Sequence, residues 1–205
     1  MADTAFYCIL SHEGVLAVRG PDANKFLQGQ VTCNLNYLSD SYSSLGARCT
    51  PKGRMQSSFR ILSVSDGYLL AMASDLLDAQ LTDLKKYAVF SKSKLTDESQ
   101  DWLRIGLNGA DDILRSLGLE LAATADSVAR RDDLLALRLS DGRAELWIPA
   151  GQATAVQAQV ASQLPEAPLN DWLLAQVRAG IGQVVGSTRE LFIPQMINLQ
   201  AVGGV

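Results

Sequence analysis

The order of apolar and polar positions repeats once along the chain. In the first copy a short β-type run, Val15 to Gly20, ends where Pro21-Asp22 opens a helical segment. Two β-rich runs then flank Ser65-Asp66-Gly67, a hairpin signal, and leucines recur at helical spacing from Leu77 to Leu84. This copy predicts a strand, a helix, a hairpin and a second helix, in that order.

The second copy follows the same order with few identical residues. Leu103 to Gly109 reads as the strand, and Ala110 to Gly118 reads as the helix. Two β-rich runs flank Ser140-Asp141-Gly142, and another helical pattern comes after them. The repeated order favours an α+β fold of two ferredoxin-like units, each an antiparallel sheet with helices against one face.

These patterns place the first unit at residues 1–100 and the second at residues 101–190. A helix that starts at Asn170-Asp171 and contains Trp172 belongs to the second unit. Residues 191–205 contain no obvious complete element, and we expect them to return toward the first unit.

Composition narrows the class of protein. The chain has 205 residues, a formal net charge of −4 and 47% apolar residues, which is ordinary for a folded protein. The longest apolar run, Tyr68 to Ala73, is too short to cross a membrane, and the N-terminus lacks the basic flank of a signal peptide. Cys8, Cys33 and Cys49 form no paired motif. We therefore expect a cytoplasmic protein with reduced thiols and no membrane contact.

The residues offer no catalytic constellation. His12 is the single histidine, and no metal-ligand or phosphate-loop spacing occurs. We expect no catalytic and no metal-binding residues. The basic run around Tyr87 and Phe90 fits either a polyanion site or a solvated helix end. Trp172 fits either a stacking platform for a flat heterocycle or the core.

Three segments carry a family resemblance: Gly20-Pro21-Asp22-Ala23 with Phe26 to Thr32, Pro51 to Met55 with Leu84 to Lys92, and Phe192 to Val205. Together they resemble the bacterial YgfZ-type folate-binding proteins, which are relatives of the glycine cleavage T protein, an aminomethyltransferase. The resemblance covers essentially the whole chain.

This resemblance implies a fold with domains around a folate channel, and tetrahydrofolate or a folate derivative as cofactor. It implies a folate-binding accessory protein that supports iron–sulfur enzymes such as tRNA methylthiolases, without turnover of its own. It also implies truncation before a K-G-C-Y-T-G-Q-E signature and a C-terminal barrel. Surfaces that normally meet the barrel would favour a homodimer, and contact with tRNA is left open.

The resemblance also assigns candidate folate-binding residues. Trp172 aligns with a family tryptophan at the folate site, and Lys86 and Tyr87 lie in a matching basic segment. Met196 and Asn198 belong to the terminal motif. Many relatives have glutamate where this chain has Met196, and a thioether is a poor acceptor for pterin N–H groups.

A second departure concerns chemistry. T proteins carry an aspartate pair after a Gly-Gly turn, whereas this chain has Lys52-Gly53 followed by Gln56 and Ser57. An amide and a hydroxyl cannot replace a carboxylate as acid or base. Tetrahydrofolate-dependent aminomethyl transfer and a tRNA-binding module are the two alternative functions.

Overall fold

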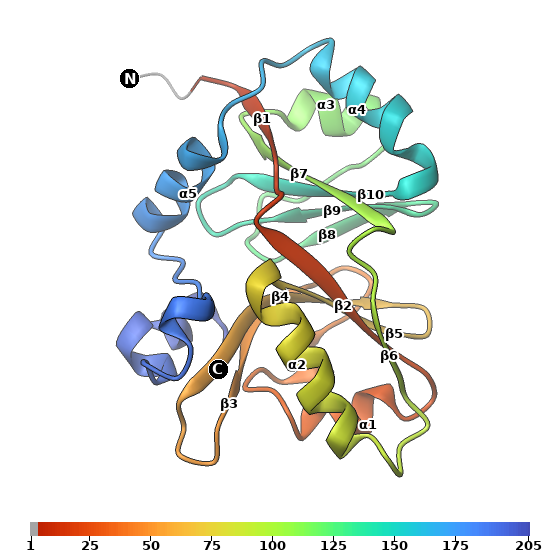
Figure 1. Cartoon of the computed structure of the whole chain (residues 1–205). Coiled ribbons are helices and arrows are strands. Elements are labelled where there is room, and N and C mark those ends of the chain that lie inside the picture. The colour runs from red at the N-terminus through yellow and green to blue at the C-terminus, as the bar shows by residue number, and fades with distance from the viewer. Residues whose placement is uncertain (1–3) are drawn as a thin grey trace. The chain divides into compact units, whose positions relative to one another are not determined.

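The computed structural model describes residues 4–205 as two compact units (Figure 1). The first unit comprises His12–Ser99 and Gly180–Val205, and the second comprises 4–11 and Gln100–Ala179. Each contains one five-stranded sheet whose neighbouring strands run antiparallel. The predicted α+β fold is confirmed. Within 4–205, no helix is both long enough and apolar enough to span a membrane.

The sheet of the first unit has the strand order β3-β4-β5-β2-β6. One face is covered by α1 (Ala23–Gln28) and α2 (Ser74–Tyr87), and a short 3-10 turn, η1, spans Leu35–Tyr37. Alternate strand residues share a face, so Leu16, Val18, Ile61, Leu70 and Met72 pack together beneath the helices. The strands are β2 (Glu13–Arg19), β3 (Ser44–Cys49), β4 (Met55–Val64), β5 (Gly67–Ala73) and β6 (Lys94–Asp97).

The sheet of the second unit has the order β1-β7-β10-β9-β8. Helices α3 (Asp111–Ser116) and α4 (Ala153–Ala161) supply apolar side chains to the core on one face, and η2 (Ala150–Gln152) precedes α4. Helix α5 (Leu169–Arg178) follows Pro168. The strands are β1 (Phe6–Ile9), β7 (Trp102–Asn108), β8 (Val128–Arg131), β9 (Leu134–Arg138) and β10 (Ala144–Pro149).

The two units are built alike except for their edge strands. In chain order, β2-α1-β3-β4-β5-α2 corresponds to β7-α3-β8-β9-β10-α4, and equivalent strands occupy equivalent sheet positions. The strand that precedes each copy is exchanged. β1 lies before β2 in sequence but pairs with β7, with Phe6 opposite Asn108, whereas β6 lies before β7 but pairs with β2.

Because of this exchange, the units do not follow a single cut in the sequence. The range 1–100 assigned Phe6–Ile9 to the first unit, whereas β1 completes the sheet of the second unit. Pattern analysis identified the core strands from their own residues, but the pairing of an edge strand depends on a partner about a hundred residues away.

The C-terminal segment packs on the first unit as short 3-10 turns: η3 (Gly186–Thr188), η4 (Pro194–Ile197) and η5 (Leu199–Val202). Leu199 is buried with Met55 and Leu76. Backbone hydrogen bonds join Met55 to Glu190 and to Phe192. The segment is thereby held by both apolar burial and hydrogen bonds.

Candidate functional site

The second unit buries a tryptophan on the sheet face that lies opposite α3 and α4. Trp172 belongs to the first turn of α5 and is 0% exposed. Its indole lies against Gly106 of β7: a Cβ at this glycine would be 2.6 Å from two indole carbons. Contacts this close are not tolerated, so residue 106 must lack a side chain for the indole to be seated there.

Arg143 holds this tryptophan from the hairpin turn before β10. Its guanidinium carbon lies 4.1 Å from the centre of the Trp172 ring, in cation–π geometry. Nε donates to Asp141 at 2.6 Å, Nη2 donates to Gln176 at 2.7 Å, and Nη1 donates to the Trp172 carbonyl at 3.3 Å. Because the buried cation is paired and hydrogen-bonded, it fixes the orientation of the indole at little electrostatic cost.

The indole N–H is the unsatisfied atom in this arrangement. Trp172 Nε1 is buried, and no hydrogen-bond acceptor lies within reach among residues 4–205. Buried tryptophan N–H groups usually find a partner, because leaving one unpaired costs free energy. Gly106 and Arg143 both lie against the ring, so the indole is enclosed and its N–H is left without an acceptor among the described residues.

The same sheet face carries a second polar and aromatic cluster. Arg104 donates to Glu145 at 2.6 Å, and Trp147 Nε1 donates to the same carboxylate oxygen at 3.1 Å. The guanidinium of Arg104 lies 4.5 Å from the centre of the Trp147 ring, and Trp102 meets that ring edge-on. In the strand register Glu145 lies opposite Gly106. Charged and aromatic side chains therefore surround the position that seats Trp172.

Cys8 also points to this face, opposite Gly106. Burial is the main reason that the pKa of its thiol is raised, and the negative charges of Glu166 and Asp171 raise the pKa further. The thiol is kept protonated and is a poor nucleophile. Among residues 4–205, no group of three His, Cys, Asp or Glu side chains is placed to hold a metal ion.

The other candidate residues lie in the first unit. Met196 is 59% exposed on η4, and Asn198 is exposed with a φ of 52° between η4 and η5. Asparagine tolerates this left-handed conformation better than most residues. The observed contribution of Asn198 is therefore to the backbone turn.

Lys86 and Tyr87 lie at the C-terminal end of α2, whereas the turn at Asn198 lies near its N-terminal end. Lys86 lies 3.7 Å from Asp83, and Tyr87 is 61% exposed. Residues near Asn198 pack with Leu76 in the first turn of α2, whereas Tyr87 ends this 14-residue helix. The helix is about 20 Å long, so Lys86 and Tyr87 lie far from Met196 and Asn198. Trp172 belongs to the second unit.

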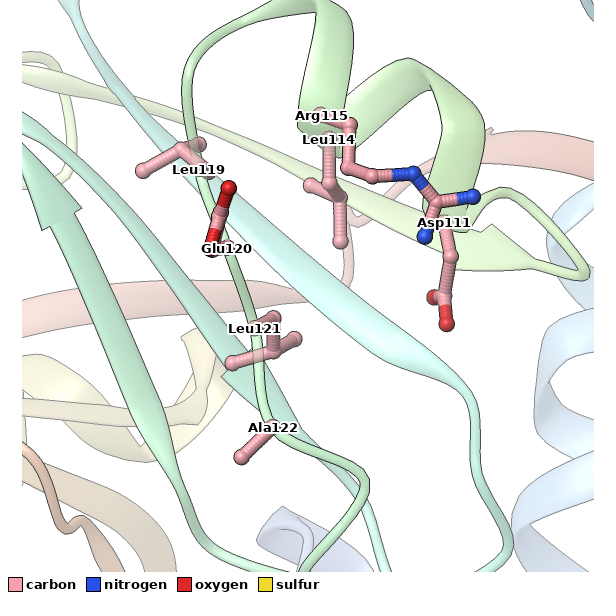
Figure 2. A pocket seen from close by; sticks show the side chains of 7 residues that line it. All are labelled: Asp111, Leu114, Arg115, Leu119, Glu120, Leu121 and Ala122. Atoms are coloured by element: carbon pink, nitrogen blue, oxygen red, sulfur yellow. The ribbon is translucent and has the colours of Figure 1, made fainter.

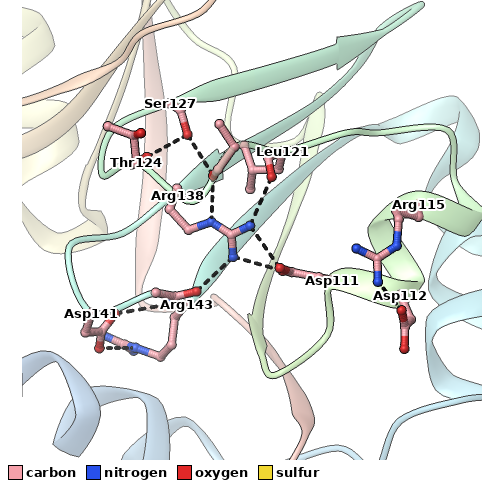
Figure 3. Close-up of polar contacts among 11 residues, drawn as sticks. Asp111, Asp112, Arg115, Leu121, Thr124, Ser127, Arg138, Asp141 and Arg143 are labelled. Atoms are coloured by element: carbon pink, nitrogen blue, oxygen red, sulfur yellow. Dashed lines mark hydrogen bonds and ion pairs between the residues drawn. The ribbon is translucent and has the colours of Figure 1, made fainter.

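A cavity lies beside α3, between the helix and the segment after it (Figure 2). Its volume is about 390 Å³. Nearby Arg138 uses all its guanidinium nitrogens, bonding to Asp111 and to the carbonyls of Leu121, Ala122 and Gly142 (Figure 3). Arg138 therefore ties loops together and is not free for a ligand. The cavity is lined by Asp111, Leu114, Arg115, Leu119, Glu120, Leu121 and Ala122.

Sequence reasoning selected Trp172 but not the residues around it. The predicted strands contained or bordered four residues of the site: Arg104, Gly106, Arg143 and Glu145. The available signal was alternation: Arg104 and Glu145 are charged residues inside β-rich apolar runs, which indicates a strand face that is not ordinary core.

The fold of this chain resembles those of two solved enzymes. The glycine cleavage system aminomethyltransferase T of Bartonella henselae matches with a TM-score of 0.69 at 17% identity, over 81% of this chain and 48% of that one. The heterotetrameric sarcosine oxidase of Corynebacterium sp. U-96 matches with a TM-score of 0.55 at 13% identity, over 78% and 85%. At these identities the likeness concerns the fold alone, which is that of the glycine cleavage T protein.

The sequence relatives are more specific. The chain is 34% identical over 193 residues to the tRNA-modifying protein YgfZ of Enterobacter sp. (strain 638), covering 92% of this chain and 59% of that protein. For YgfZ of Hamiltonella defensa the identity is 30% over 203 residues, covering 96% and 60%. The chain is thus a relative of the YgfZ-type tRNA-modifying proteins, as the sequence motifs indicated, and spans about three fifths of their length. No protein-family model matches it.

Proposed function

We propose that this chain binds a folate at Trp172 and acts as an accessory protein in tRNA modification, in support of iron–sulfur enzymes such as tRNA methylthiolases. One observation carries the folate site: the buried Trp172 N–H has no acceptor within the described residues. The role in tRNA modification is supported by the YgfZ relatives, and the iron–sulfur clients come from the family resemblance.

A pterin fits the chemistry of this site. Its carbonyl and ring nitrogens are hydrogen-bond acceptors, and Trp172 offers a donor on a rigid, buried indole edge. Arg143, held by Asp141 and Gln176, keeps that edge in place. Bound tetrahydrofolate would supply a one-carbon carrier. The chain's own contribution is to bind and orient it.

Met196, Asn198, Lys86 and Tyr87 enter the proposal through the resemblance. The exposed Met196 offers no strong acceptor to a pterin N–H. For this reason the first experiment addresses Trp172.

The residues in place of the T-protein aspartates favour an accessory role over aminomethyl transfer. Ser57 is 0% exposed, and its hydroxyl donates to Gln80 at 3.1 Å. Gln56 supplies an amide. Neither group takes up a proton near neutral pH, so aminomethyl transfer would lack its acid or base here.

Titration with tetrahydrofolate, followed by calorimetry and by tryptophan fluorescence, tests the proposal. Trp172→Phe keeps an aromatic ring but removes the N–H. We expect it to weaken binding by about 5- to 20-fold, because a buried acceptor on the ligand loses its hydrogen bond. Trp102→Phe is the matched control in the same unit, since the Trp102 ring packs edge-on against Trp147. It should bind like the unmodified chain.

Equal weakening by both variants would contradict a specific role for Trp172. No binding by this chain would be followed by the same titration on a longer form that includes the remaining two fifths of the relatives' length. Absence of binding there would refute the folate assignment.

A further inference from the structure

Lysines gather in one region of the first unit. The chain has six lysines, and five of them lie on α1, at the end of α2 or in the segment that follows: Lys25, Lys85, Lys86, Lys92 and Lys94. All five are exposed. The sixth, Lys52, is in the turn between β3 and β4. A chain of net charge −4 thus carries five of its six lysines in one region.

Exposed aromatic side chains lie among these lysines. Phe90 is 101% exposed and Tyr87 is 61% exposed, although large apolar side chains are normally buried. Both border a cavity of about 250 Å³ that is also lined by Asp22, Lys25, Phe26 and Ser91. The carboxylate of Asp22 accepts a hydrogen bond from the Lys92 backbone N–H. The apolar residues Leu77 and Leu84 of α2 are buried in the core of the first unit. The exposed rings therefore have no role in packing α2.

The segment that carries these side chains is anchored. The backbone N–H of Lys92 donates to the Asp22 carboxylate at 2.8 Å, and Ser91 N–H donates to the Ala88 carbonyl at 2.9 Å. A Cβ on Gly20 would lie 2.3 Å from the Lys92 carbonyl oxygen, so the two backbones touch. Ordering the backbone before binding lowers the entropic cost of recognition.

We propose that this surface binds single-stranded RNA with unstacked bases, such as a tRNA loop. We call it the basic aromatic patch, formed by Lys25, Lys85, Lys86, Tyr87, Phe90 and Lys92. Lysines neutralise phosphates, and exposed rings stack on bases that are not held in a duplex. The inference deepens the proposed role in tRNA modification by giving the RNA a binding surface.

Charge and shape favour RNA over a lipid surface. Membrane-surface helices present a broad apolar face to the lipid, whereas the apolar face of α2 is buried in the core. Isolated rings flanked by ammonium groups instead suit an alternation of bases and phosphates. The cavity is smaller than the roughly 300–1,000 Å³ of most small-molecule sites, which is consistent with contact to single bases.

Fluorescence anisotropy of the full chain with a labelled 12-nucleotide single-stranded RNA of mixed sequence tests this inference. We expect tighter binding to the single strand than to the same strand annealed to its complement. Phe90→Ala should weaken binding roughly 5- to 150-fold, the range for loss of one base–aromatic stack. Phe90→Leu, which keeps apolar surface without a π-face, should weaken it nearly as much.

The charge contribution is tested separately. Lys86→Gln with Lys92→Gln should reduce the slope of log affinity against log salt by about 0.7 for each phosphate that the protein no longer neutralises. Lys52→Gln is the control for each of the two single changes, because it removes one positive charge outside the patch, and it should leave the slope unchanged.

Several outcomes would overturn the inference. These are affinity unaffected by Phe90→Ala, equal effects of the patch and Lys52 variants, or no preference for the single strand. Binding to vesicles that contain anionic lipid without binding to RNA would identify the patch as a lipid contact instead. The RNA assay contains no folate, so this inference and the folate proposal can fail independently.

Discussion

The two units share a strand order but differ on one face of the sheet. This face lies opposite α1 and α2 in the first unit and opposite α3 and α4 in the second. Aligned on the turns at Gly20 and Gly109, the first unit has Val15 and Ala17 where the second has Arg104 and Gly106. On the neighbouring strand, Leu69 and Ala71 of the first unit correspond by register to Glu145 and Trp147.

This difference separates what the two copies share from what only one of them carries. The face that packs against the helices is apolar in both units, because it supplies the core. On the opposite face, the first unit has Val15, Ala17, Leu69 and Ala71 on β2 and β5, with buried Arg60 of β4 opposite Ala71. At the positions of those four residues the second unit has the paired Arg104 and Glu145, the ring of Trp147, and Gly106, which seats Trp172. The fold is common to both copies, whereas the Arg104–Glu145 pair and the glycine that seats Trp172 occur in the second unit.

The largest expected effect comes from breaking the buried ion pair of the second unit. Glu145→Leu removes the carboxylate that pairs with Arg104 and should lower the free energy of unfolding by about 3–5 kcal/mol. Arg104→Val together with Glu145→Leu gives these two positions the residues of the first unit and should recover most of that loss. Urea unfolding measures both. Equal losses in the single and double variants would show that the charge left unpaired is not the cause.

A pH experiment compares buried thiols in the two units. Burial raises the pKa of Cys33, in the first unit, to about 11. The unfolded thiol loses its proton near pH 9, whereas the folded thiol keeps it. The free energy of unfolding should therefore fall between pH 9 and 11, by on the order of 2–3 kcal/mol, and be insensitive to this group below pH 9.

Cys33→Ala should flatten that dependence in unfolding curves recorded from pH 8 to 11. Cys8→Ala is the counterpart in the second unit, where burial also raises the pKa of the thiol. An unchanged slope in Cys33→Ala would mean that other groups cause the alkaline loss.

A smaller effect is expected from adding one methyl group beneath Trp172. Gly106→Ala places a Cβ 2.6 Å from indole carbons and should cost about 1–3 kcal/mol, with a changed near-ultraviolet circular dichroism spectrum. Gly151→Ala is the control, because a Cβ there meets nothing within 4 Å. A Gly106→Ala protein as stable as this control would show that the indole is not tightly seated.

The smallest effect is expected for Arg115→Ala, at the rim of the cavity beside α3. Arg115 pairs with Asp112 at the exposed surface, so Arg115→Ala should change stability by less than about 0.5 kcal/mol. Arg138→Ala leaves Asp111 and several carbonyl oxygens without their donor and should cost about 1–3 kcal/mol. Thermal unfolding distinguishes the two, and similar values would mean that Arg138 does not tie the loops together.

Local patterns were enough to predict most of the fold. The two hairpins around Ser65-Asp66-Gly67 and Ser140-Asp141-Gly142 are present, because alternation and turn residues act over a few positions. The exchange of β1 and β6 was not visible in the sequence. A strand of four residues pairs equally well with several edges until the whole sheet is known.

The site was predictable only in part, for a related reason. Trp172 was selected by resemblance, but its dependence on Gly106 and Arg143 joins residues that are 66 and 29 positions away from it. No spacing rule connects a glycine in a strand with a tryptophan in a distant helix. The exposure of Phe90 was also hidden, because an isolated phenylalanine in a sequence is more often core.

The position of β1 has a consequence for synthesis of the chain on the ribosome. Phe6 emerges first, yet its partner Asn108 is made about a hundred residues later. At about 5–20 residues per second, the strand waits roughly 5–20 s before its partner strand β7 has been made. During that interval an apolar strand with open hydrogen-bonding groups is a target for chaperones and for mispairing. Altering the residues of β1 should therefore reduce the yield of folded protein through the second unit, although β1 precedes the whole first sheet in the chain.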